Sequence, residues 1–203
     1  MAARGQIDEA ITYVTERAGV NTHEVTIARF AEDLLLKANR RGEAFNRYAL
    51  VANQSNSNLS TYRGLAKKYP ELDPKKLLTF LISSTPGEPG KWFATAKTLK
   101  LYDLASELTM ASPCDPKTLI RAATAHMTSR PEFAMNCALA ALHWISLGHG
   151  YEMSGWEVRD AHRMAMDAAA TAGQSELAQA RIGQVLAHDR PLATRMKQVL
   201  GIP

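Results

Sequence analysis

The sequence has two cysteines and almost no pattern typical of β-strands. Alternating β-branched runs bounded by turn residues do not occur, whereas Ala, Leu, Lys, Arg and Glu are frequent. No HExxH, GxSxG, GxGxxG or GxxxxGK[ST] motif is present, and each is a frequent sign of a zinc, hydrolase, dinucleotide or phosphate site. We therefore predict an all-α protein, and we expect no enzymatic activity, no metal site and no cofactor.

Long hydrophobic runs are also missing. No apolar run approaches the roughly 20 residues that a membrane-spanning helix needs, and Asp8, Glu9, Glu16 and Arg17 interrupt the apolar core that a signal peptide would require. Cys114 and Cys137 form no CxxC pair, and a reducing compartment would keep both as thiols. We expect a cytoplasmic protein that does not contact a membrane.

Helix-start and helix-stop residues, in contrast, recur along the whole chain. Apolar spacing, N-cap residues, prolines and glycines predict a series of helices. We place them near 6–18 (ended by Gly19), 24–41, 43–53 and 59–69, from Pro74 and from Pro116 onward, and near 91–110 (with a break near Lys100), 131–147, 154–172, 175–187 and 191–200.

The inward faces of these helices follow from the same spacing. In the second helix we expect a set of five apolar side chains to point inward: Ile27, Phe30, Ala31, Leu34 and Leu35. Farther along the chain we expect seven large side chains to be buried where helices stack: Leu78, Leu81, Leu104, Leu119, Leu139, Leu142 and Trp144.

One polar stretch, at residues 53–58, suggests a boundary. We divide the chain there into a helical extension, 1–55, and a helical-repeat domain, 56–203. Two pairs of markers support a repeat, because Asp73-Pro74 and Asp115-Pro116 are 42 positions apart, as are Pro89 and Pro131. A period near 40 residues is typical of stacked helix pairs. We predict stacked antiparallel helix pairs in a TPR- or HEAT-like right-handed helical repeat.

Residues 89–187 also carry a resemblance. It rests on the segments Pro89-Gly90-Lys91-Trp92-Phe93, Leu101-Tyr102-Asp103-Leu104-Ala105, Asp115-Pro116-Lys117-Thr118-Leu119-Ile120-Arg121-Ala122-Ala123, Ala138-Leu139-Ala140-Ala141-Leu142-His143-Trp144 and Gly148-His149-Gly150-Tyr151-Glu152. Together these segments resemble the C-terminal TPR-like helical-repeat region of a group of uncharacterised bacterial proteins. The resemblance covers about half of the chain. It implies a TPR-like fold and a bacterial or phage origin, but no reaction.

Basic residues are concentrated in one part of the sequence. Residues 37–76 hold nine Lys and Arg against three Asp and Glu, whereas residues 131–180 hold two against six. If the nine share a face, they could bind phosphates, but the simpler interpretation is a Lys- and Arg-rich face exposed to water. The nine are Lys37, Arg40, Arg41, Arg47, Arg63, Lys67, Lys68, Lys75 and Lys76.

Titratable and aromatic residues gather between 143 and 162. A catalytic or metal site would need several of His143, His149, Glu152, Glu157, Asp160 and His162 to converge, and the simpler interpretation is a polar turn followed by a capping box from Ser154. Around the same turn, Tyr151 and Trp156 are candidate partner-binding residues, although such side chains more often fill gaps between helices. Cys114, just before a helix, is a further candidate nucleophile, because that position can lower the pKa of a thiol.

These observations favour a binding protein over an enzyme. We expect a non-enzymatic protein-protein interaction module, either an adaptor or a small inhibitor of a partner protein or complex. The alternative is binding of nucleic acid or a nucleoprotein complex through the basic residues. The sequence does not identify the partner, and it leaves open whether the chain forms a homodimer.

Overall fold

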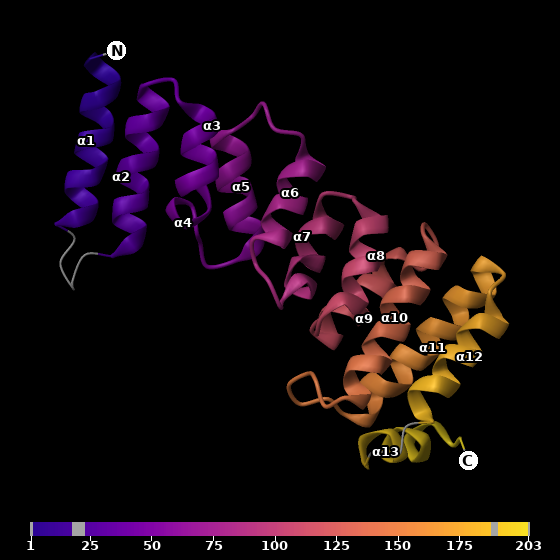
Figure 1. The fold of residues 1–203 in the computed structure, drawn as a ribbon. Helices are drawn as coiled ribbons and strands as arrows, with labels where there is room; N and C mark the ends of the chain where they lie inside the picture. Colours follow the sequence, from indigo (N-terminus) through magenta and orange to yellow (C-terminus); the bar gives the residue numbers. More distant parts are fainter. Residues whose placement is uncertain (1, 18–22, 188–190, 203) are drawn as a thin grey trace. The chain divides into compact units, whose positions relative to one another are not determined.

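The computed structural model describes residues 2–17, 23–187 and 191–202, with side chains from residue 5 onward. Within these residues every regular element is a helix and no strand occurs (Figure 1), as the sequence predicts. None of the described helices is both long and apolar enough to cross a membrane. The chain divides into two compact units, Met1–Leu81 and Ile82–Pro203.

The first unit contains short helices that follow one another closely. They are α1 (Ala2–Glu16), α2 (Glu24–Lys37), α3 (Arg41–Ala44), η1 (Phe45–Ala49), α4 (Leu50–Ala52), α5 (Asn58–Lys68) and most of α6 (Pro74–Ser83). The polar stretch at 53–58 lies inside this unit, between α4 and α5. The domain division at residue 55 stays a prediction. Gly19, expected to end the first helix, lies outside the described residues.

The second unit contains the longest helices. Its elements are η2 (Pro89–Trp92), α7 (Phe93–Thr98), α8 (Tyr102–Ala111), α9 (Pro116–His126), α10 (Pro131–Ser146), α11 (Gly155–Ala172), α12 (Ser175–Leu186) and α13 (Pro191–Leu200). Helix α10 is the centre of this unit, because it contacts α8, α9, α11, α12 and α13. Most of its side chains are buried, from Phe133 to Ser146. It therefore forms the floor against which its neighbours pack.

The two Asp-Pro pairs act alike in the structure. The Asp73 carboxylate accepts a hydrogen bond from the backbone N–H of Lys76, and the Asp115 carboxylate accepts one from that of Thr118, both at 2.9 Å. Each aspartate therefore caps the helix that its proline opens, α6 or α9. Pro89 and Pro131 likewise begin η2 and α10. The markers are equivalent in their local roles, and the 42-residue repeat itself stays a prediction.

Two helix breaks lie at non-glycine residues with positive φ. Asn39 (φ 57°) separates α2 from α3, and Lys100 (φ 61°) separates α7 from α8. The break near Lys100 was predicted, whereas the second helix was expected to continue to Arg41. Asparagine adopts this left-handed conformation more easily than most residues, and the prediction did not use that property.

The predicted helix at 43–53 contains a π-helical turn, η1, between α3 and α4. Ala44 and Ala49 at the edges of this turn are both fully buried although they are five positions apart. In a regular α-helix five positions place side chains about 140° apart. The wider turn is what allows both alanines to face the core of the first unit.

Burial agrees with most of the predicted core. Leu78, Leu81, Leu119, Leu139, Leu142 and Trp144 are buried, while Leu104 is half-buried. In α2 the prediction for Phe30 is wrong, because this side chain is 40% exposed. The predicted Ala31 and Leu35 are buried, together with Ala28 and Glu32, while Ile27 and Leu34 are half-buried. A charged residue on that face was not expected from the sequence.

Candidate interaction surfaces

Four of the nine basic residues are paired with acidic side chains of the first unit. Arg40 contacts Asp8 at 2.7 Å and Glu43 at 2.6 Å, and Arg47 also contacts Glu43 at 2.9 Å. These arginines lower the pKa of Glu43, with the hydrogen bond from Arg40 as the largest cause. The carboxylate stays ionised and neutralises part of the basic region.

Arg41 forms a similar pair. Its Nε lies 2.7 Å from Glu71, and its guanidinium also donates to the backbone oxygen of Lys68 at 2.6 Å. The hydrogen bond from Arg41 is the largest cause of the lowered pKa of Glu71. The guanidinium also lies 5.4 Å from the centre of the Tyr69 ring. Arg41 therefore holds the end of α5 and the following turn rather than projecting into solvent.

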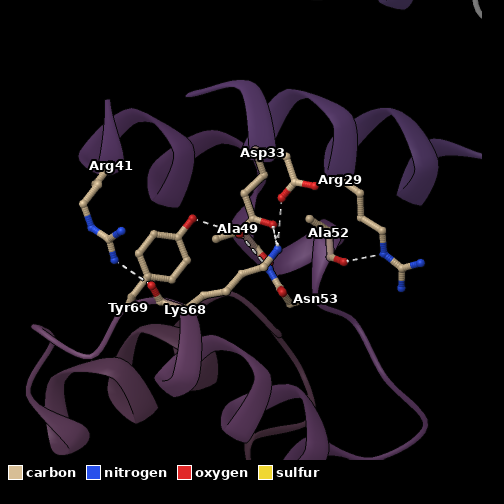
Figure 2. A network of polar contacts seen from close by, with 9 residues as sticks. Arg29, Asp33, Arg41, Ala49, Ala52, Asn53, Lys68 and Tyr69 are labelled. Carbon is tan, nitrogen blue, oxygen red and sulfur yellow. Dashed lines mark hydrogen bonds and ion pairs between the residues drawn. The ribbon is translucent and has the colours of Figure 1, made fainter. Parts of the chain in front are cut away.

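Lys68 belongs to a buried polar network, part of which Figure 2 shows. The Glu32 carboxylate is fully buried and accepts hydrogen bonds from Asn53 at 2.8 Å, Tyr69 at 2.8 Å and Lys68 at 2.5 Å. Burial first, and then the bond to Glu32, raise the pKa of the Tyr69 hydroxyl, which stays a neutral donor. The network ties α2 to the ends of α4 and α5.

Five basic residues remain exposed: Lys37, Arg63, Lys67, Lys75 and Lys76. Within the part of the chain that the structure describes, none of the five forms an ion pair. Arg63 and Lys67 lie four positions apart on α5, opposite its buried face, and Lys75 and Lys76 lie in the first turn of α6. A phosphate-binding surface in this unit could therefore use five exposed cations rather than nine.

The histidines between 143 and 162 do not converge. His143 lies at a groove between α8, α10 and α12, whereas His149 lines a small pocket beside the N-terminus of α11 and His162 lines a hollow between α11, α12 and α13. His143 and His149 flank the Trp144 ring, with centroids 4.7 and 5.4 Å away. Among the described residues no group of three His, Cys, Asp or Glu could hold a metal ion.

Two of the three acidic members of that cluster, Glu157 and Asp160, have local partners. Glu157 closes a capping box with Ser154, and Asp160 pairs with Arg163 at 3.2 Å. The bond from Ser154 is the largest cause of the lowered pKa of Glu157. The capping box predicted from the sequence is thus present, and these two carboxylates stabilise the start of α11.

Tyr151 and Trp156 differ from Trp144 in their environment. Trp144 is buried, and its indole N–H donates to the backbone oxygen of Thr109 at 2.7 Å. Tyr151 and Trp156 are 80% and 74% exposed. The Arg159 guanidinium lies 5.7 Å from the centre of the Trp156 ring. Both predicted partner-binding side chains are therefore accessible, on the loop before α11 and on its first turn.

Cys114 does not meet the requirements of a nucleophile. Its thiol is buried and donates to the backbone oxygen of Gly90 at 3.2 Å. Burial, followed by the nearby charge of Asp115, raises the pKa of the Cys114 thiol to about 12. The expected effect of a helix N-terminus is thus reversed, because desolvation of the thiolate outweighs it.

One hollow in the second unit was not predicted from the sequence. It is a groove of about 540 Å³ between α8, α10 and α12. We call it the α10 groove. Its lining residues are Ser106, Glu107, Thr109, Met110, Asn136, Leu139, Ala140, His143, Arg181, Gln184 and Val185.

The α10 groove combines an apolar floor with a polar rim. Leu139 and Ala140 of the floor are buried, while Met110 at the α8 wall is 53% exposed. Arg181 on the α12 wall donates to the Asn136 side chain across the groove at 3.1 Å. Helical periodicity marks these floor residues as core, and only the packing of three helices shows that a groove runs above them. A volume of this size is typical of ligand-binding clefts.

Comparison of the chain with protein-family models, with curated proteins and with solved structures finds no match. The likeness of residues 89–187 to a bacterial helical-repeat region therefore stays a prediction.

Proposed function

We propose that this protein is a non-enzymatic protein-protein interaction module that binds a segment of a partner protein in the α10 groove. It would act as an adaptor or as a small inhibitor of that partner or its complex. The observation that carries the proposal is the groove itself, in which the half-exposed Met110 stands beside the apolar floor of Leu139 and Ala140. The proposal keeps the cytoplasmic location expected from the sequence.

The lining of the groove suits a polypeptide. An apolar anchor from the partner would cover Met110 and the floor, and burial of apolar area stabilises such a contact. Around the floor, Asn136, Gln184 and Arg181 offer donors and acceptors to a bound backbone. A short segment of protein supplies both kinds of group along its length.

Tyr151 and Trp156 provide a second contact surface in this proposal. Both side chains are largely exposed, and Trp, Tyr and Arg are the residues on which interface energy concentrates. Arg159 adds a guanidinium beside the Trp156 ring.

The test is a selection of binding peptides from a display library of random short peptides, using the purified full-length chain as bait. We expect enrichment with the native protein and its loss with Gln184→Trp, because the indole would fill the groove from the exposed face of α12. Thr171→Trp is the matched control, since it adds the same side chain to an exposed position of α11 outside the groove. Loss of enrichment with both variants, or with neither, would argue against binding in the groove.

Binding of nucleic acid through the first unit is the second candidate. The specific observation in its favour is the exposure of five cations that form no ion pair within the described residues: Lys37, Arg63, Lys67, Lys75 and Lys76. Against it stands the neutralisation of the other four by carboxylates, so fewer phosphates could be contacted at once.

A further inference from the structure

Two side chains of opposite charge stand on opposite walls of the α10 groove. Glu107 lies on α8 and Arg181 on α12, and both are exposed. Helix α10 contacts both α8 and α12 and supplies the floor between them. The groove therefore has a negative wall, an apolar centre and a positive wall.

Among the described residues, no carboxylate or ammonium group pairs with either charge. Arg181 makes its recorded hydrogen bond to the neutral amide of Asn136, and within the described ranges neither Arg181 nor Glu107 takes part in an ion pair. The bond to Asn136 fixes the direction of the guanidinium while leaving its charge unpaired. Both walls are thus available to charges on a bound segment.

We propose that the α10 groove selects a bipolar peptide segment, with a basic side chain beside Glu107, an acidic side chain beside Arg181, and an apolar side chain between them on Leu139 and Ala140. This inference rests on the proposed function and specifies the chemistry of the partner. It excludes the uniformly charged partners, because any of them would meet a like charge at one wall.

The spacing of the three groups follows from helix packing. Adjacent packed helices lie about 8–10 Å apart, so the axes of α8 and α12, which both pack on α10, are at most about 16–20 Å apart. An extended chain covers about 3.3–3.6 Å per residue. A basic and an acidic residue about five or six positions apart would therefore reach both walls, with the apolar anchor near the middle.

The inference also distinguishes a peptide from nucleic acid in this groove. A nucleic acid carries negative charge along its whole length, and Glu107 would repel it. A peptide can place opposite charges at its two ends. Charge complementarity thus favours a protein segment at this site.

The experiment is a charge analysis of peptides selected by the full-length chain and by two reversal variants. With the native chain, enriched peptides should be bipolar. Glu107→Lys leaves two positive walls and should enrich peptides that are acidic at both ends, and Arg181→Glu should enrich peptides that are basic at both ends. The double variant Glu107→Lys/Arg181→Glu restores one wall of each sign, so it should select bipolar peptides again.

Titration with one bipolar peptide recovered with the native chain measures how much each charge contributes to peptide binding. Each single reversal should weaken its binding roughly two- to fivefold, the range for exposed charge pairs. The double variant should recover part of this loss through the opposite peptide direction. Glu107→Gln and Arg181→Gln should each show a smaller loss, and far-ultraviolet circular dichroism should show native helicity in every variant.

Two kinds of failure can be told apart. Enrichment of peptides without charge preference, or an unchanged preference in the reversal variants, would overturn the bipolar inference and leave groove binding intact. Absence of any enrichment with the native, folded chain would contradict the proposed function itself.

Discussion

Glu32 shows how a single buried charge can organise a unit of short helices. Its carboxylate has three donors, from Asn53, Lys68 and Tyr69, and it is fully buried. Removing one partner from a buried ionic network is costly, because the remaining groups stay desolvated without their acceptor. Removal of Glu32 would therefore leave these donors without their acceptor.

We expect Glu32→Ala to lower the free energy of unfolding by about 1–3 kcal/mol, because the buried Tyr69 hydroxyl loses its acceptor, whereas Lys68 is a third exposed and keeps Asp33 nearby. Urea denaturation followed by circular dichroism measures this change. Glu71→Gln is the control, because its pair with Arg41 is exposed and such pairs contribute about 1 kcal/mol or less. Equal effects of the two substitutions would mean that the buried network has no special role.

His126 makes stability depend on pH. Its ring makes edge-on contacts with the rings of Tyr102 and Phe133. Burial first, and then the charges of Lys97 and Arg130, lower the pKa of His126. In the unfolded chain histidine titrates at about pH 6.5. The unfolded chain therefore binds the proton first as pH falls. Stability is fully present above that pH and decreases below it, until the folded protein is protonated as well.

His126→Gln should reduce this acid sensitivity. The urea midpoint should fall less between neutral pH and a pH about one unit below the histidine value. Some pH dependence should remain, because burial lowers the pKa of His162 in the same direction. If the urea midpoint of the variant fell with pH as much as that of the native chain, His126 would be excluded as a source of the pH dependence.

At the scale of the helix, Gly90 and Gly183 differ in the space around their backbone. A Cβ atom at Gly90 would lie 2.4 Å from the backbone oxygen of Ser112, whereas one at Gly183 would meet nothing within 4 Å. Gly90 allows η2 to approach the segment after α8, and its N–H donates to the Ser112 hydroxyl at 2.7 Å. Gly183 lies within α12 without a comparable contact.

We expect Gly90→Ala to destabilise the protein by about 1–3 kcal/mol through overpacking. Gly183→Ala should stabilise it by about 0.5–1 kcal/mol, because alanine loses less backbone entropy in a helix. Thermal unfolding of both variants beside the native chain makes the comparison. Changes of the same sign would contradict this difference between the two positions.

At the scale of the whole molecule, the pairing of the basic residues decides which charge variants are informative. Reversing Arg40, Arg41 or Lys68 would break ion pairs that hold the first unit together. Reversal at these three positions would therefore remove ion pairs as well as change the surface charge, because their partners are Asp8, Glu43, Glu71, Glu32 and Asp33.

The informative variant reverses the exposed cations Lys37, Arg63, Lys67, Lys75 and Lys76 to Glu. If the first unit binds nucleic acid, this variant should lose binding while keeping its helicity. The native affinity should fall with salt at a log–log slope of about −0.9 per phosphate contacted on duplex DNA. Fluorescence anisotropy with duplex and single-stranded DNA at two salt concentrations is the measurement. No binding of the native chain at low salt would remove this second candidate.

The sequence predicts the helices well because their ends depend on local chemistry. Asp115 before Pro116, and the Ser154–Glu157 pair, cap their helices through neighbours within three positions. The buried role of Glu32 could not be predicted in this way, since its partners are 21 to 37 positions away. Charge composition likewise cannot show that Arg41 faces Glu71.

The candidate surfaces, like the fold, could be predicted from the sequence only in part. The exposure of Trp156 and Tyr151 agrees with their selection as contact residues, although their partner-binding role is a proposal. The α10 groove could not be predicted, because it exists only where α8, α10 and α12 pack together. Residues such as Glu107 and Arg181 have no sequence signal that links them across 74 positions.

The π-helical turn at Phe45–Ala49 suggests how this chain could have changed during its evolution. Such a turn accommodates one residue more than an α-helical turn, because its hydrogen bonds run from i to i+5. Ala44 and Ala49 would be four positions apart in a chain without the exposed Asn46, and a regular α-helix would then keep both on one face. An ancestral or related chain one residue shorter at this point could thus share the same core. An alignment of this chain with a homologue should allow a single-residue gap at the π-helical turn.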